Sequence, residues 1–97
     1  MRKRMTIEQM LFPDGEVEEY EFNNDELKLI FRDSNGINFL LKFGGSLEVK
    51  EQGSVGLSVY QSHLDQDGDR AKLRLLDDDL KEMLTIRFRV CQIEATK

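Results

Sequence analysis

Residue types that commonly carry catalysis or covalent cross-links are scarce in this sequence. It has one cysteine (Cys91), one histidine (His63), one proline and no tryptophan. A lone cysteine cannot form an internal disulfide, and proteins of oxidising compartments usually have several cysteines, so we expect a cytoplasmic protein. No apolar run approaches the roughly eighteen residues of a membrane-spanning helix, and we expect no membrane partner.

Positive charge is also in deficit. Fourteen Lys and Arg stand against nineteen Asp and Glu, which gives a net charge of −5. Nonspecific nucleic-acid binding depends on Lys and Arg that neutralise phosphates, so we expect no nucleic-acid partner. The field of an anionic protein would instead attract a basic protein.

The length of 97 residues suits one domain, 1–97, because a chain of this size buries about two-thirds of its surface on folding. The basic start, 2–4, is followed by no apolar segment, so it does not resemble a signal peptide. We expect residues 1–5 to be frayed.

Alternation of apolar and polar residues dominates the rest of the sequence and predicts strands with one dry and one wet face. Five segments show it: 27–32, 37–43, 55–60, 71–75 and 84–91. The predicted fold is mainly β, an antiparallel meander of six or seven strands in a curled sheet or small barrel, with at most a short helix. Five phenylalanines would face its interior: Phe22, Phe31, Phe39, Phe43 and Phe88.

Three turns fix the register of this predicted sheet. A three-residue loop with Gly36 in the left-handed region puts every large apolar residue of its hairpin on one side, whereas a two-residue Asn35-Gly36 turn would not. The pairs expected across the three turns are Phe31 with Phe39, Phe22 with Leu27, Glu21 with Lys28, and Val49 with Val55.

Some positions fit this scheme less well. Residues 6–12 read either as a strand, which the turn 13–15 would close into a hairpin, or as a short helix with a capping box. A few apolar residues fall on the wet face and predict cover by a helix or a second subunit in a homodimer. They are Ile30, Leu40, Leu76 and Ile93.

Two acidic motifs could carry chemistry: 65–69 as a cation site, and 77–79 as neighbouring carboxylates for acid–base work. Asp65, Asp67 and Asp69 have the alternate spacing of a calcium loop, but the position that needs a bidentate glutamate is Leu76. We expect a turn there and, at most, a weak cation site. The run 77–79 is also expected to be a turn, and we expect no cofactor.

A nucleophilic Cys–His pair would require the single cysteine and the single histidine to lie within hydrogen-bond reach. Cys91 falls on the predicted face of Arg87 and Arg89, whose charges would lower its pKa if it were exposed. His63 belongs to another hairpin, and nothing in the spacing brings the two together. We therefore expect no enzyme.

Charge is segregated along the chain. The segment 14–27 contains no cation, and its candidate partner-binding residues are Glu16, Glu18, Glu19, Glu21, Asp25 and Glu26. The C-terminal hairpin has a basic stripe, whose candidate anion-contacting residues are Lys72, Arg74, Arg87 and Arg89. Either surface could dock an oppositely charged partner or could be a solvated face.

The stretch 26–59, about a third of the chain, contains the runs ELKLIFRD (26–33) and FLLKFGG (39–45), with Gly36 between them. They resemble small β-rich bacterial families, some of which are immunity proteins of contact-dependent and polymorphic toxin systems. The resemblance implies a non-enzymatic inhibitor that covers a toxin's active site, with the 14–26 carboxylates against a basic nuclease. The expected function is a non-catalytic protein-binding domain; alternatives are a small-ligand-binding β-barrel and a structural or oligomerisation domain.

Overall fold

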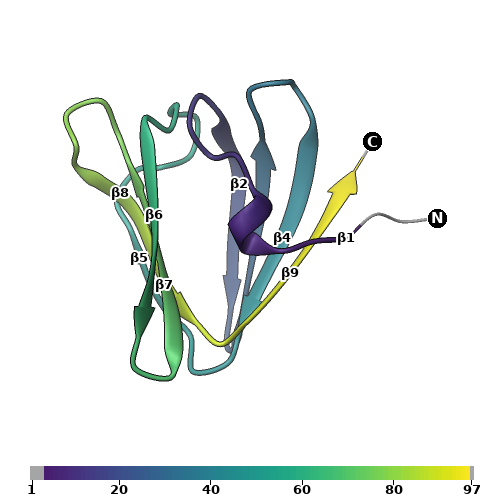
Figure 1. The fold of residues 1–97 in the computed structure, drawn as a ribbon, viewed down its shortest axis with the longest axis vertical. Helices are drawn as coiled ribbons and strands as arrows, with labels where there is room; N and C mark the ends of the chain where they lie inside the picture. Colours follow the sequence, from purple (N-terminus) through teal and green to yellow (C-terminus); the bar gives the residue numbers. More distant parts are fainter. Residues whose placement is uncertain (1–3, 97) are drawn as a thin grey trace.

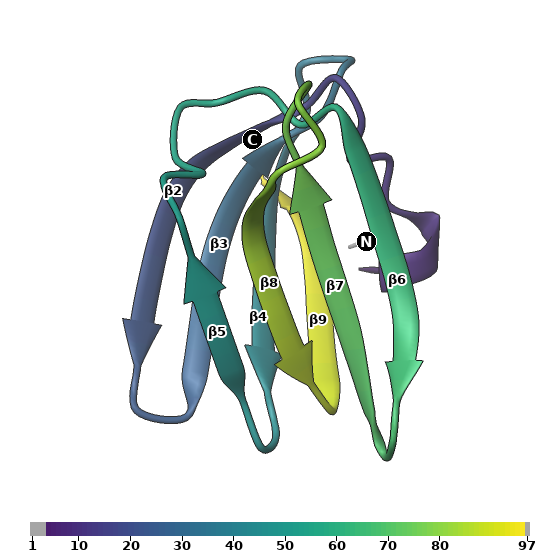
Figure 2. The same ribbon diagram turned by 90° about the vertical axis from the view of Figure 1, so that its left-hand side faces the viewer.

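The computed structural model describes residues 4–96, which form two antiparallel sheets packed face to face (Figures 1 and 2). The five-stranded sheet has the order β1-β9-β4-β3-β2, and the four-stranded sheet has the order β5-β8-β7-β6. The strands are β1 (Arg4–Met5), β2 (Glu16–Asn23), β3 (Glu26–Arg32), β4 (Asn38–Gly44), β5 (Glu48–Glu51), β6 (Gln61–Asp67), β7 (Arg70–Leu76), β8 (Glu82–Phe88) and β9 (Val90–Thr96).

The mainly β, antiparallel prediction is confirmed, but its strand count and its curled sheet or barrel are wrong. Eight strands have four or more residues, β1 has two, and the two sheets do not close into a barrel. The chain leaves the first sheet after β4 and returns to it only in β9. Each dry face is thus covered by the other sheet, which removes the need to curl.

The alternating segment 84–91 is two strands rather than one. A break at Arg89 ends β8 in the four-stranded sheet, and β9 then continues beside β4 in the other sheet. The Arg89 N–H donates to the carbonyl oxygens of Gly44 and Gly45, at 2.9 and 3.1 Å, which secures the crossing. After Arg89, the alternation of side chains that point toward the core no longer continues that of β8.

Two of the three predicted turn registers are confirmed. Phe31 pairs with Phe39, and the Asp33–Ile37 loop between them has Gly36 at φ 80°. The β2–β3 pairs are Phe22 with Leu27, and Glu21 with Lys28.

The register predicted across 51–53 is wrong. Val49 pairs with Ile86 of β8, not with Val55. Residues 52–60 instead cross to the edge of β2, where the Gly56 N–H donates to the Val17 carbonyl at 2.8 Å. In the predicted strand 55–60, Val55 and Leu57 are consequently about half exposed.

Residues 6–12 do not form the predicted strand, and the alternative of a short helix with a capping box is confirmed in part. A single 3-10 turn covers Ile7–Gln9, and the Thr6 N–H donates to Gln9 Oε1 at 3.0 Å. Phe12 is buried in the core, and the Pro13–Gly15 turn, although present, leads into β2 without closing a hairpin. Of the segment predicted to be frayed, 1–3 lies outside the described residues, while Arg4–Met5 pairs with β9.

Two aromatic contacts lie in the core, and one of them joins the two sheets. Phe43 of β4 and Phe88 of β8 make an edge-to-face contact with ring centroids 4.9 Å apart, and Phe12 meets Phe31 in the same way at 5.1 Å. Phe22, predicted to face the interior, is instead 44% exposed at the end of edge strand β2.

The prediction that four apolar residues lie on the wet face is correct for two of them and wrong for the other two. Leu76 and Ile93 are buried. The irregular pairing of β7 with β8 interrupts the alternation of inward and outward side chains at Leu76, and the crossing at Arg89 does so before Ile93. Ile30 and Leu40 do lie on the outer face, where they pair directly and are half-buried. No helix covers them within residues 4–96.

Gly15→Ala is expected to destabilise the domain by about 2 kcal/mol or more. A Cβ at this position would lie 2.3 Å from the Phe31 ring and 2.7 Å from the Arg32 carbonyl oxygen. The measurement is the free energy of unfolding in urea. Gly53→Ala is the control, because its Cβ would meet nothing within 4 Å and only the positive φ of 82° opposes it, at about 1 kcal/mol. Equal losses in the two variants would contradict the close packing at Gly15.

Candidate functional site

A β-bulge in β2 gathers the glutamates of this strand. Val17 pairs with Phe31, and the next paired residue is Glu19, opposite Ile30, so that Glu18 is an additional residue. The bulge keeps Val17 fully buried while it turns Glu19 to the outer face of the sheet. The outer side therefore carries four carboxylates, which we call the β2 acidic face: Glu16, Glu18, Glu19 and Glu21.

The β2 acidic face is only partly neutralised. Arg32 contacts Glu16 and Glu18, with N–O distances of 3.4 and 3.7 Å. Glu19 and Glu21 have no ion pair within residues 4–96, although Lys28 lies opposite Glu21. Excess negative charge therefore remains on this face.

The other two predicted partner-binding residues, Asp25 and Glu26, lie at the β2–β3 hairpin. Glu26 begins β3 and lies 4.0 Å from the Lys28 ammonium, and Asp25 is exposed in the turn. Asp25 makes no ion pair in the described part of the chain. These carboxylates extend the negative charge of β2 to its end.

A depression of about 480 Å³ lies beside this surface. Ile30 and Leu40 line it together with three glutamates and one cation, Lys28, and it reaches the β2 edge at Tyr20 and Val55. Burial, assisted by the Glu51 carboxylate, raises the pKa of Tyr20, which therefore keeps its hydroxyl proton. The site combines apolar surface with carboxylates and has the chemistry to hold a side chain with a long apolar stem and a cationic end.

The predicted basic stripe and the predicted cation motif lie together on the outer face of the four-stranded sheet. Each aspartate of the motif contacts one arginine of the stripe. The pairs are Arg74 with Asp65 at 3.1 Å, Arg87 with Asp67 at 2.7 Å, and Arg89 with Asp69.

Two further carboxylates balance this surface. Glu48 of β5 contacts Arg87 at 3.0 Å, and Glu82 of β8 lies 4.0 Å from Arg74. The Asp67 carboxylate is the main cause that raises the pKa of Arg87. Lys72, on the central strand β7, lies opposite Asp65 of β6 on one side and Arg87 of β8 on the other. Here opposite charges face each other within the protein, and the three aspartates turn to guanidinium groups rather than to a common point.

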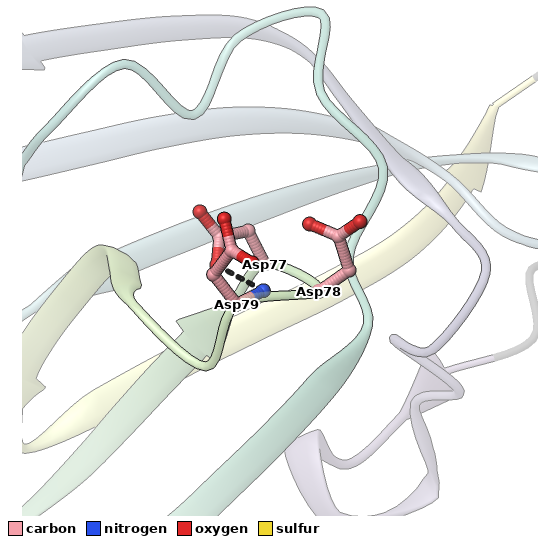
Figure 3. Close-up of side chains that lie close together, drawn as sticks. All are labelled: Asp77, Asp78 and Asp79. Carbon is pink, nitrogen blue, oxygen red and sulfur yellow. Dashed lines mark hydrogen bonds between the residues drawn. The ribbon is translucent and has the colours of Figure 1, made fainter.

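The aspartates 77–79 form the predicted turn between β7 and β8 (Figure 3). Asp77 Oδ1 accepts the N–H groups of Asp79 and Lys81, both at 2.9 Å, and so shapes the loop. The three carboxylates lie within 4.8 Å of one another. Because the Asp77 oxygen is already engaged with the backbone, the turn accounts for this residue without an ion.

The loop at Asp33 has the same construction. Asp33 Oδ1 accepts the N–H groups of Asn35 and Ile37 at 2.9 Å, as Asp77 does in its own loop. The left-handed position is Gly36 in one loop and Leu80, with φ 62°, in the other. A leucine at that position carries a steric cost which glycine avoids.

The structure separates Cys91 from His63. Cys91 lies in β9 opposite Phe43, on the inner face, and not beside Arg87 and Arg89 as predicted, because the chain changes sheets at Arg89. Burial raises the pKa of its thiol to about 12, which makes it a poor nucleophile at neutral pH. His63 is in β6 of the other sheet, opposite Arg74.

A hydrogen-bonded loop holds the segment that reaches β2. The Glu51 carboxylate accepts the Gly53 N–H at 3.1 Å and both the backbone N–H and the hydroxyl of buried Ser54. The Ser54 contacts are the main cause that lowers the pKa of Glu51. This loop places Val55 and Gly56 against the start of β2.

The β2 bulge was missed at the sequence level, although a signal exists. The apolar residues Val17, Tyr20 and Phe22 are spaced three and then two apart, so strict alternation fails once. All three fall on the inner side only if one residue is additional. The pairing of the basic stripe with 65–69 depends on the β6–β7–β8 order, which alternation does not specify.

Comparison with protein-family models, with curated proteins and with solved structures gives no match. In the portion of the chain that the structure describes, no helix has the length and apolar character needed to cross a membrane.

Leu80→Gly is expected to stabilise the domain by about 0.5–1 kcal/mol, because it removes the cost of a side chain at positive φ. The reciprocal change at the matching position, Gly36→Ala, is expected to destabilise it by about 1 kcal/mol. Both are measured by urea unfolding. Destabilisation by Leu80→Gly would show that the exposed Leu80 side chain contributes more than its backbone strain costs.

Glu51→Gln is expected to make stability less sensitive to acid. A lowered pKa means that ionised Glu51 stabilises the fold above pH 4.5, its ordinary value, and that this contribution is lost as the pH falls below it. Unfolding in urea at pH 7 and pH 3 should show a variant that is weaker than the parent at pH 7 and closer to it at pH 3. Glu8→Gln, at an exposed carboxylate outside this loop, should follow the parent at both values.

Proposed function

We propose that this protein is a non-catalytic binding domain that docks a basic protein through the acidic segment 14–26, centred on the β2 acidic face. An immunity-type inhibitor of a bacterial toxin is the form of this function that the resemblance in 26–59 suggests. A reducing compartment such as the cytoplasm suits a protein with a single, half-buried thiol.

The observation that carries the proposal is the difference between the two charged surfaces. On the four-stranded sheet, arginines and carboxylates pair with each other. On β2, Glu19 and Glu21 lack such partners among residues 4–96 and stand beside apolar surface. Unbalanced charge around a partly apolar depression favours association with a surface of opposite charge.

The paired stripe also argues against a nucleic-acid partner. Arg74, Arg87 and Arg89 would have to give up carboxylate contacts before they could bind phosphates. The wide separation of Cys91 from His63 supports a function without catalysis, since a nucleophile needs its base within hydrogen-bond reach.

The direct test is the affinity for a fluorescent oligolysine peptide, measured by anisotropy at low and high salt. The parent protein should bind at about 50 mM salt and lose most of the binding at about 500 mM, because screening shortens the range of the interaction. The double variant Glu19→Lys/Glu21→Lys should lose binding even at low salt.

The matched control is Asp78→Lys/Asp79→Lys, which makes the same change in net charge at two exposed residues of the β7–β8 turn, outside the depression that Glu19 and Glu21 line. Its affinity should stay much closer to that of the parent. If both double variants weaken binding equally, net charge alone drives the attraction, and the β2 acidic face is not the docking surface.

A further inference from the structure

The edge of β2 is open for most of its length. β2 is the last strand of its sheet and pairs on one side with β3. On its other side, only isolated bridges at Glu16 and Val17 connect it to the 55–58 segment. From Glu18 to Asn23, no further strand of residues 4–96 pairs with this edge. Alternate residues of an edge strand direct their N–H and C=O groups outward, where another strand can pair with them.

The side chains along this open edge differ between the two faces of the strand. The outer face carries Glu19 and Glu21. The inner side carries Tyr20 and Phe22, which pair with buried residues of β3, and Phe22 is 44% exposed. Val55, 48% exposed, lies beside Tyr20 in the depression. An added strand would therefore meet carboxylates with one set of alternate side chains and apolar groups with the other.

A second copy of the protein is a poor occupant of this edge. Two β2 strands paired edge to edge would place the outer glutamates of each copy against those of the other, and like charges in adjacent strands are destabilising. Charged residues on edge strands commonly prevent such self-pairing. The same residues would attract lysine or arginine from a different chain.

We propose that β2 binds an extended segment of the basic partner as an additional strand along Glu18–Asn23. Basic and apolar side chains alternate in that segment. This proposal rests on the proposed function. The basic side chains lie on the outer face toward Glu19 and Glu21, at the rim of the depression. The apolar side chains cover Tyr20, Phe22 and Val55. Backbone hydrogen bonds supply affinity, and the two rows of side chains supply selectivity.

The test uses short synthetic peptides that alternate lysine and valine and are long enough to span Glu18–Asn23. A peptide of the same composition with its lysines and valines in separate blocks is the first control. We expect the alternating peptide to bind about tenfold or more tightly than the block peptide, because only the alternating one matches both faces of the edge.

Backbone methylation then isolates the strand pairing. One peptide is N-methylated at its lysines and another at its valines; in a bound strand only one of these two rows of N–H groups faces β2. We expect one methylated peptide to bind about tenfold or more weakly and the other to bind like its parent, since loss of two or three net hydrogen bonds has this effect.

The results that would contradict strand addition differ from those that would contradict the proposed function. If both methylated peptides bind like the parent, or both weaken equally, strand addition is overturned, while binding that depends on Glu19 and Glu21 would leave the proposed function standing. If neither these peptides nor oligolysine binds at low salt, the proposed function fails with it. A dimer that Tyr20→Pro abolishes would assign the edge to a second copy and would also overturn the proposal.

Discussion

The packing of two apolar sheet faces against each other is the constraint on which this structure depends. Neither sheet could remain exposed on its inner side, and the contact between Phe43 and Phe88 joins the strands at the centre of the two layers. The crossing at Arg89 lets one continuous segment contribute to both layers. Once the layers are fixed, the outer faces and the sheet edges are the surfaces left for function.

The charges on these outer surfaces are organised in two different ways. The four-stranded sheet brings 65–69 next to three arginines, so its charges are satisfied within the protein. Individual exposed pairs of this kind contribute little to stability, but together they leave few free cations for a partner. The bulge at Glu18 has the opposite effect, since it brings carboxylates together at an edge where, among residues 4–96, only Arg32 and Lys28 oppose them.

Local features of the fold could be predicted from the sequence, whereas the assembly of the sheets could not. Alternation and turn chemistry correctly predicted the pairing of Phe31 with Phe39 and of Phe22 with Leu27, because these hairpins are determined by adjacent residues. The pairing of Val49 with Ile86 joins segments far apart in the chain, and the short run 51–53 gave no sign of it. Likewise, nothing in the alternation of 84–91 marks the change of sheet that turns Cys91 inward.

The same distinction applies to the candidate site. The acidic character of 14–26 is evident in the composition, but its concentration on one face depends on a bulge that a strictly alternating strand would not contain. The cation motif and the basic stripe were recognised as separate features, and only the order of β6, β7 and β8 shows that they meet.

The central claim is that β2 presents an open, negatively charged edge to a basic partner, and amide hydrogen exchange along β2 tests it most directly. On addition of an alternating lysine–valine peptide at low salt, the account predicts slower exchange at alternate residues between Glu18 and Asn23, with no comparable change along β6, the edge of the other sheet. Unchanged exchange along β2 at saturating peptide, or protection confined to β6, would contradict it.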